Sequence, residues 1–309
     1  MRFILCLSLA SCCVTVPHAA GQAPTFRATT DAVAVNVSVK QGRAPVSGLS
    51  ATDFRLTDNG VAQDVAAVSL DAVPVDLSIV VDTSASAFPD LDVARTAVRG
   101  MAEFLRPSDR FRVLTMGNSV VSAIPWRSAG VPDTARIQLV EGNISLIADA
   151  VVLALFHRPD LDRRHLVVVL TDGDDICSMV SGDALKKGAE RSGAVLHWID
   201  IQLERGKART ASMSQGLHAS CRWARLPSDM RPFLSEAVRQ TGGTVHTAWY
   251  GGAKVTVDAF DEIFDDFRRS YIRHYVPVGV ERGGFHKLSV TAPSKNYSIG
   301  ARPGYWSPK

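Results

Sequence analysis

The chain has 309 residues, of which 46% are hydrophobic and 21% charged, and its formal net charge is +3. These values are typical of an ordinary globular protein with one large or two modest domains. No dense Lys/Arg patch with interleaved aromatic residues occurs, so we expect no nucleic-acid partner.

Residues 1–20 (MRFILCLSLASCCVTVPHAA) predict a secretory signal peptide, because one Arg precedes an apolar stretch that ends in small residues. The stretch is too short and wrongly flanked for a membrane span; the alternative is a buried N-terminal strand. Within it, residues 9–12 (LASC) are similar to a bacterial lipoprotein box, which would make Cys12 a lipid anchor. We therefore expect an exported protein (periplasmic, outer-membrane-associated or extracellular) with no transmembrane span after signal removal.

Signal removal would leave only Cys177 and Cys221. Two cysteines in an exported chain can pair, and closing a loop of this length contributes roughly 4 kcal/mol in the chain-entropy model. We predict a Cys177–Cys221 disulfide, and the alternative is two buried thiols.

Residues 22–72 predict a small β segment. Residues 31–39 (DAVAVNVSV) alternate, with Val at every second position from Val33, as in a half-buried strand. A short strand around Phe54 leads to Asp58-Asn59-Gly60, a hairpin signal because Asn-Gly tolerates positive φ. We expect the returning strand at residues 65–70. A segment of this size is too small to be stable alone.

From Val75 the pattern changes to strands that alternate with helices, and residues 73–275 predict a doubly wound α/β domain with a mainly parallel sheet. Residues 166–170 are wholly Leu and Val, which is typical of a strand buried on both faces. The expected strands are 75–82, 111–116, 120–124, 165–170, 195–201 and 244–247. The expected helices are 91–105, 133–140, 147–156, 183–191, 231–241 and 257–271. Residues 203–230 form the longest polar insertion.

Residues 276–309 return to short strands such as KLSVTA and YSIGARPGY. Because neither flank of the α/β domain can hold a core alone, we predict that they pack together as one small β unit, with the α/β domain inserted between them.

Oxygen-bearing side chains gather where two predicted buried strands end. Asp82 closes the first strand and is followed by Ser84 and Ser86; Asp172 closes the second, and Ser145 opens a helix between them. Ligands collect beyond the carboxyl ends of parallel strands, and two adjacent carboxylates repel unless a cation compensates them. Mg²⁺ suits such hard oxygen ligands best. The alternative is turn and helix-cap chemistry.

The set D-x-S-x-S at 82–86, the hydroxyl of Ser145 and T-D-G at 171–173 resemble the metal-ion-dependent adhesion site of von Willebrand factor type A domains. The resemblance implies that fold and, as metal ligands, Asp82, Ser84, Ser86, Ser145 and Asp172. The family usually has Thr where Ser145 stands. Residues 36–65, 241–244, 271–277 and 301–305 are similar to the acidobacterial type A-related group of exported bacterial proteins.

The leading functional hypothesis is metal-dependent protein binding. Mg²⁺, or Mn²⁺ or Ca²⁺, would take the acidic side chain of a protein partner as its last ligand. We expect Phe88, Pro89, Trp126 and residues 203–230 to line the rim. The rival hypothesis is a structural module of the periplasm or outer membrane with a vestigial metal site. A weaker one is a hydrolase that activates water at the ion.

Motifs of other chemistries are absent. There is no G-x-S-x-G, G-x-x-x-x-G-K-[ST] or G-x-G-x-x-G, so we expect no enzyme. The His residues lack zinc-ligand spacing, and we interpret His157 and His165 as structural. Residues 174–175 predict a solvated acidic loop or support for the ligands. Arg268, Arg269 and Arg273 predict a charged solvent face.

Overall fold

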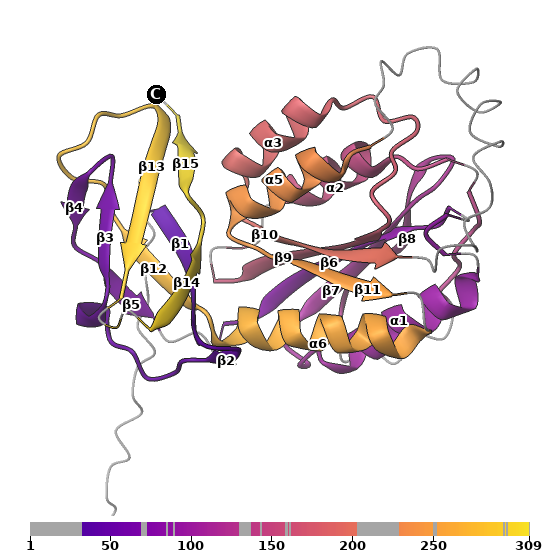
Figure 1. The fold of residues 1–309 in the computed structure, drawn as a ribbon, viewed down its shortest axis with the longest axis horizontal. Helices are drawn as coiled ribbons and strands as arrows, with labels where there is room; N and C mark the ends of the chain where they lie inside the picture. The colour runs from indigo at the N-terminus through magenta and orange to yellow at the C-terminus, as the bar shows by residue number, and fades with distance from the viewer. Residues whose placement is uncertain are drawn as a thin grey trace, which may run out of the picture.

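The computed structural model describes residues 33–68, 73–84, 86–88, 90–129, 137–142, 144–157, 160, 162–202, 229–249, 252–292, 294 and 296–308. The predicted signal peptide, Cys12, Cys221 and residues 203–228 lie outside this part of the chain. The described residues form an α/β domain beside a smaller β unit (Figure 1).

The α/β domain is built on a six-stranded sheet with the order β11-β10-β9-β6-β7-β8. All neighbouring strands are parallel except β7 and β8, which are antiparallel. The two central strands, β6 and β9, are buried along their whole length, as their apolar sequences predict. The strands are β6 (Val75–Asp82), β7 (Arg110–Met116), β8 (Val120–Ser128), β9 (Arg164–Thr171), β10 (Val195–Gln202) and β11 (Val245–Trp249).

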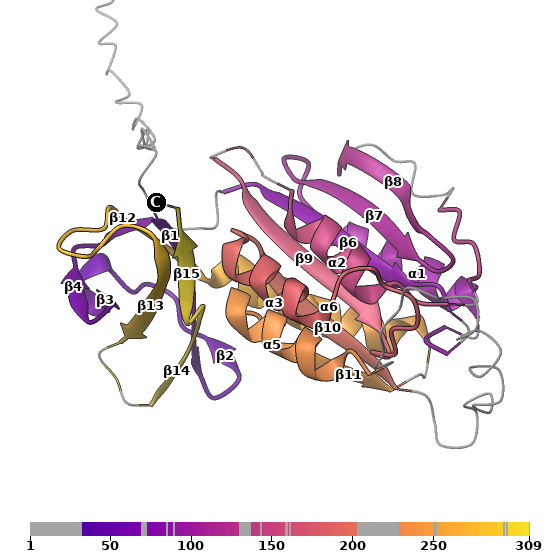
Figure 2. The same cartoon turned by 90° about the horizontal axis from the view of Figure 1, so that it is seen from above.

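Helices cover both faces of this sheet (Figures 1 and 2). Helices α1 (Leu91–Glu103) and α6 (Ala253–Arg269) pack on one face, and their apolar sides join one hydrophobic core. The second core lies under α2 (Ile147–Leu155), α3 (Gly182–Arg191) and α5 (Arg231–Thr241). This confirms the doubly wound α/β prediction. The helix predicted at 133–140 is not confirmed, since residues 137–140 are irregular and 133–136 lie outside the described residues.

The β unit combines strands from both ends of the chain in two sheets. One has the order β14-β1-β12-β5, with β2 (Ala44–Pro45) also on β1, and the other has the order β15-β13-β3-β4. A separate core that includes Val37, Phe54 and Leu288 lies in this unit. The two flanks therefore pack together, as predicted. The strands are β1 (Val33–Gln41), β3 (Arg55–Asp58), β4 (Val61–Gln63), β5 (Ala66–Val68), β12 (Tyr271–Tyr275), β13 (Gly284–Thr291), β14 (Tyr297–Ala301) and β15 (Gly304–Ser307).

The predicted hairpin is present, but its second strand starts earlier than expected. Asn59 and Gly60 have φ values of 47° and 84° between β3 and β4. The returning strand is therefore β4, not residues 65–70. Strand β5 pairs instead with β12, which forms from the last residues of the segment assigned to the α/β domain.

The charged solvent face predicted at the end of α6 is wrong for two of its residues. Arg268 is 6% exposed and forms an ion pair with the fully buried Asp109. Arg273 is fully buried in β12, with its guanidinium carbon 3.7 Å from the centre of the Phe54 ring. Arg268 is therefore held inside the α/β domain and Arg273 inside the β unit, and neither lies on a solvated surface.

Candidate metal centre

Asp82 is the last residue of strand β6 and is fully buried. It lies at the carboxyl edge of the sheet, the edge at which the parallel strands end. Its Oδ1 accepts hydrogen bonds from the backbone N–H of Ser84 at 2.9 Å and from Ser145 Oγ at 3.1 Å. Its Oδ2 accepts one from Thr171 Oγ1 at 2.7 Å. Three chain segments therefore converge on one carboxylate.

The loop after β6 carries the two predicted serine ligands. Ser84 is 4% exposed, whereas Ser86 is exposed. Their hydroxyl oxygens lie 3.0 Å apart. Ser86 also makes a side-chain hydrogen bond with Asp172, which connects this loop to the end of β9.

Ser145 reaches the same edge because its segment crosses the loop after β6. Gly142 bridges to Ser84, and a Cβ at Gly142 would lie 2.5 Å from the Cα of Gly117, so only glycine fits this crossing. Ser145 is fully buried, and its carbonyl accepts from the backbone N–H of Ile176 at 3.0 Å. The crossing thus fixes the hydroxyl beside Asp82.

Asp172 follows β9 and is 8% exposed. Its Oδ1 accepts from the backbone N–H of Asp174 at 3.1 Å. The structure therefore brings all five predicted ligand residues into one contact network: Asp82 with Ser84 and Ser145, Ser84 with Ser86, and Ser86 with Asp172.

The electrostatics of this edge favour a cation. Burial raises the pKa of Asp82, and the nearby charge of Asp172 raises it further. Burial also raises the pKa of Asp172, with Asp174 adding to the effect. A bound divalent ion would compensate both carboxylates, and serine hydroxyls are hard oxygen ligands that add no charge. The residue types present therefore fit such an ion.

Hydroxyl oxygens are essential to this interpretation. Within the described ranges, no group of three or more His, Cys, Asp or Glu side chains is arranged to hold a metal ion. A metal site at the carboxyl edge of the sheet would therefore have to combine the two carboxylates with the three serine hydroxyls.

The neighbouring acids Asp149 and Asp175 support the loop after β9. Asp175 is 4% exposed, and its Oδ2 accepts from the backbone N–H of Ala148 in the first turn of α2 at 2.9 Å. Asp149 accepts from the backbone N–H groups of Met179 and Val180 at 3.1 and 2.8 Å. Asp175 is therefore not part of a solvated acidic loop. The sequence held no signal for these contacts, because they join segments that are distant along the chain.

The predicted rim is largely wrong. Phe88 is 1% exposed and belongs to the core beneath α1. Trp126 packs against His157, with ring centres 4.3 Å apart. It lies at the opposite edge of the sheet from Asp82, the edge at which the parallel strands begin. Pro89 and residues 203–228 lie outside the described residues. Met179, which the sequence analysis missed, is 81% exposed in the loop that Asp149 holds.

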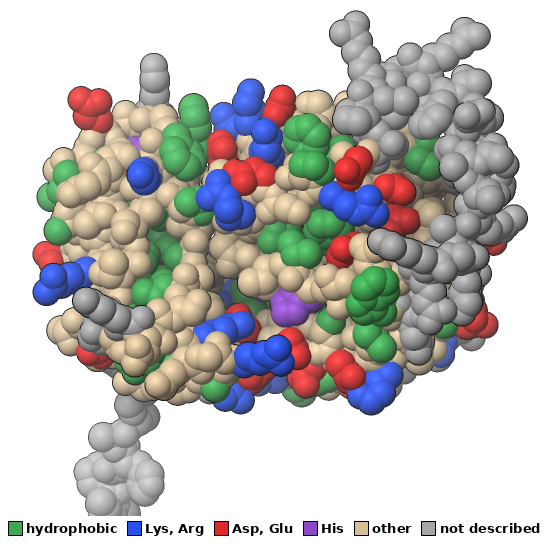
Figure 3. All heavy atoms as spheres, in the orientation of Figure 1, with side chains coloured by type: hydrophobic (Ala, Val, Ile, Leu, Met, Phe, Trp, Pro, Cys, Tyr) green, Lys and Arg blue, Asp and Glu red, His purple; other side chains and the backbone are tan. Residues whose placement is uncertain are grey.

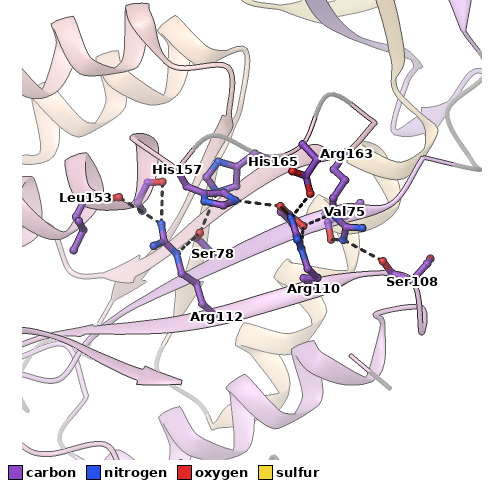
Figure 4. Close-up of polar contacts among 12 residues, drawn as sticks. Val75, Ser78, Ser108, Arg110, Arg112, Leu153, His157, Arg163 and His165 are labelled. Carbon is purple, nitrogen blue, oxygen red and sulfur yellow. Dashed lines mark hydrogen bonds and ion pairs between the residues drawn. The ribbon is translucent and has the colours of Figure 1, made fainter. Parts of the chain in front are cut away.

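A second polar cluster occupies that opposite edge (Figure 4). Asp76, fully buried at the start of β6, accepts from Arg110, Arg163 and His157. The same edge holds a second hydrogen-bonded group around His165.

The hydroxyl of Ser78 lies 3.0 Å from His165 Nε2 and accepts from Arg112 Nε at 2.9 Å. Ser78 is fully buried and His165 is 2% exposed, so a substrate cannot reach this Ser–His pair. Burial lowers the pKa of His165 to about 3, and neighbouring His157 contributes. We interpret this edge as a structural network.

Cys177 is buried near Ser145, to whose carbonyl its N–H donates at 3.3 Å. Because Cys221 lies outside the described residues, the predicted disulfide stays a prediction.

Comparison with known proteins finds likeness in structure. No family model matches the chain, and no curated protein matches it. Similar solved structures include BatB from Bacteroides thetaiotaomicron, with 14% identity and a TM-score of 0.42 over 62% of this chain and 98% of that one. Manganese-loaded TRAP of Plasmodium vivax has 14% identity and a TM-score of 0.40 over 80% and 96%.

A von Willebrand factor type A protein from Catenulispora acidiphila has 10% identity and a TM-score of 0.43, over 92% of this chain and 75% of that one. This chain is similar to von Willebrand factor type A domain proteins. The narrower resemblance to the acidobacterial type A-related group stays a prediction. In the described part of the chain, no helix combines the length and apolar character that crossing a membrane requires.

Proposed function

We propose that this chain is an exported protein-binding module that depends on a divalent cation. Asp82, Ser84, Ser86, Ser145 and Asp172 would hold the ion, and an acidic side chain of a protein partner would complete its coordination. The observation that carries the proposal is the convergence of two buried carboxylates, both with raised pKa, and three connected hydroxyls at one edge of the sheet.

The charge balance of this donor set favours an acidic partner. Two carboxylates neutralise a divalent ion, and the three serine oxygens add no further negative charge. A partner carboxylate would therefore meet a cation that is not surrounded by excess anions. Mg²⁺ is the ion we favour, with Mn²⁺ and Ca²⁺ as alternatives. The ion would supply attraction for the partner carboxylate.

Binding of this kind needs a surface around the ion, because a single ion–carboxylate contact in water is weak. Met179 offers an exposed apolar side chain in the loop after β9. The proposal assigns no reaction to the site. Export rests on residues 1–20, and a lipid anchor at Cys12 would keep the module at a membrane surface.

The first test is calorimetric titration of Mg²⁺, Mn²⁺ and Ca²⁺ into the chelator-treated mature protein. We expect binding in the wild type and its loss, by at least about tenfold, in Asp82→Ala and Asp172→Ala. Asp174→Asn is the matched control, since Asp174 is a neighbouring half-exposed acid bound to Arg231 at 3.2 Å. Circular dichroism would verify that each variant is folded.

The partner is tested with a displayed library of random peptides, selected in Mg²⁺ and eluted with chelator. We expect enriched sequences to contain Asp or Glu and to lose binding when that residue is amidated. Absence of metal binding in the folded wild type would refute the proposal and favour the structural-module hypothesis. Metal binding with no acidic enrichment would refute the carboxylate part.

A further inference from the structure

The central sheet has two outermost strands, β11 and β8, and they differ in how they treat a further strand. Strand β11 lies at the front in Figure 1, and Figure 2 shows β8 on the far side of the sheet. Edge strands usually carry a Pro, a basic residue or a bulge that prevents further pairing. Strand β8 has Pro125, Arg127 and two register shifts, whereas Val245–Trp249 (VHTAW) has none of these devices. Strand β11 is therefore an unprotected edge.

The backbone of β11 alternates between the sheet and this open edge. The N–H of Trp198 donates to the carbonyl of Thr244 at 3.1 Å, so the backbone of Thr244 faces β10. In a parallel pair, every second residue directs both its N–H and its C=O to the same neighbouring strand. The residues whose backbone groups point away from β10 are therefore Val245, Thr247 and Trp249. These N–H and C=O groups have no hydrogen-bond partner among the described residues.

The side chains of the same three residues form an apolar stripe along one face of the edge. Val245 is 43% exposed and Trp249 is 61% exposed, and Thr247 between them is exposed as well. Val245 lies opposite Trp198, which belongs to the core beneath α5, so the stripe lies on the α5 side of the sheet. A strand added to this edge would place every second side chain beside the stripe, where apolar side chains pack best.

The other face of the edge borders helix α6 and is acidic. Asp258 and Glu262 are four residues apart and lie on the same side of the helix. Lys254 binds Asp258 at 2.7 Å. Glu262 is 75% exposed and has no Lys or Arg partner among the described residues, and its Oε2 lies 3.7 Å from Nδ1 of His246 in β11. Figure 3 shows Asp and Glu side chains along α6, below the hydrophobic and His side chains over β11.

We propose that β11 binds an extended segment of a partner protein in which apolar residues alternate with Lys or Arg. The segment adds a strand to the sheet through the outward backbone groups, its apolar side chains cover Val245 and Trp249, and a basic side chain pairs with Glu262. A second copy of this chain fits the edge less well, because β11 itself holds no Lys or Arg for Glu262. The site is independent of the proposed metal-dependent function.

The probe is the acetylated and amidated peptide TVKVKVT with a fluorescent label, titrated into the mature protein in chelator so that no metal site contributes. We expect it to bind, and to slow hydrogen exchange of the amides in residues 245–249. The charge-reversed peptide TVEVEVT should bind at least about tenfold more weakly, because its acids meet Glu262. The peptide TVKVKVT with N-methylated amides keeps the side chains but loses the backbone donors, and it should not bind.

The backbone contact is tested by Thr247→Pro. Proline is tolerated at an edge position whose N–H faces solvent, so the variant should fold, but it removes an outward donor and should abolish peptide binding. Thr247→Val is the matched control, since it keeps the N–H and should bind as the wild type does. Circular dichroism and the melting temperature would verify that both variants are folded.

The side-chain contacts are tested by Trp249→Ser and Glu262→Gln, each of which should weaken binding several-fold and which decide the matter if Thr247→Pro does not fold. Their controls are Phe156→Ser, which removes a 65% exposed side chain from the end of α2, and Glu281→Gln, which removes an exposed acid from the β unit. Both controls should leave binding unchanged.

The proposal is overturned if TVKVKVT does not bind, if TVEVEVT binds equally well, or if folded Thr247→Pro binds as the wild type does. Analytical ultracentrifugation without peptide addresses the other occupant. A dimer that Thr247→Pro dissociates would assign the edge to a second copy and would also overturn the proposal.

Discussion

Replacing Asp76 by Asn should destabilise the protein through the cluster in Figure 4. The fully buried carboxylate accepts from Arg163 Nε at 2.5 Å, Arg110 Nη2 at 2.6 Å and His157 Nε2 at 3.1 Å. Burial alone would raise its pKa, but hydrogen bonds from Arg110, His157 and Arg163 lower it to about 2. At roughly 1.4 kcal/mol per pKa unit, that lowering is worth about 2 kcal/mol.

Asn also leaves two arginines without their shared anion, and breaking a buried ion pair from one side typically costs about 3–5 kcal/mol. We therefore expect a loss of about 3 kcal/mol in the free energy of unfolding. For a domain of this size, a loss of about 3 kcal/mol corresponds to a melting temperature lower by about 6–12 °C.

The assay is urea unfolding at several pH values, with Asp160→Asn as the control. Asp160 contacts the same Arg110 at 3.3 Å but its side chain is 70% exposed, so its replacement should cost at most about 0.5 kcal/mol. Because the folded pKa of Asp76 is lowered, its stabilisation is complete above the unfolded pKa near 4. The stabilisation is lost as pH falls toward 2, so wild type and Asp76→Asn should converge there. Equal losses in both variants, or a difference that does not shrink with acid, would refute the reasoning.

Three further predictions concern other parts of the fold. Because burial lowers the pKa of His165 to about 3, the unfolded chain binds a proton at this residue below about pH 6.5, whereas the folded protein does not. The free energy of unfolding, measured with urea, should therefore be about 1.4 kcal/mol lower at pH 5.5 than at neutral pH, and His165→Gln should lack this loss. Gly243→Ala should prevent stable folding, since its Cβ would lie 1.8 Å from a carbonyl oxygen of β10, whereas Gly193→Ala has open space and should leave the melting temperature unchanged. Intact-mass measurement after alkylation without reductant should find no label at Cys177 or Cys221 if they pair, and label on both would contradict the pairing.

The sequence predicted the parts of the fold that depend on local pattern. Apolar runs such as 166–170 identified the central strands, and the alternation of strands and helices identified the α/β domain. Strand β4 was missed because its Val61-Ala62-Gln63 has little apolar pattern; it forms because the turn at Asn59-Gly60 directs it back along β3.

Long-range features were less predictable. The two acidic site residues could be placed together because each ends a buried strand, and parallel strands bring their ends to one edge. The full ligand set came from the resemblance to von Willebrand factor type A domains. The rim could not, since the direction of β8 places Trp126 at the opposite edge, and Phe88 turns inward. Arg268 and Arg273 have the sequence pattern of a solvated face, but contacts with distant residues bury them: Arg268 pairs with Asp109, and Arg273 lies over the ring of Phe54.

The pairings of β1 and β15 have a mechanical consequence. Strand β1 is antiparallel to β12, and β15 is antiparallel to β13, so in each pair the outer ends of the two strands leave the sheet on the same side. Tension applied at Val33 and Ser307 would therefore break the backbone hydrogen bonds of these pairs one after another. The α/β domain follows β5 and ends at β12, so it would carry no load until β1 had separated from β12 and β14. A stretched chain would therefore lose its β unit first and keep the carboxyl edge of the central sheet intact.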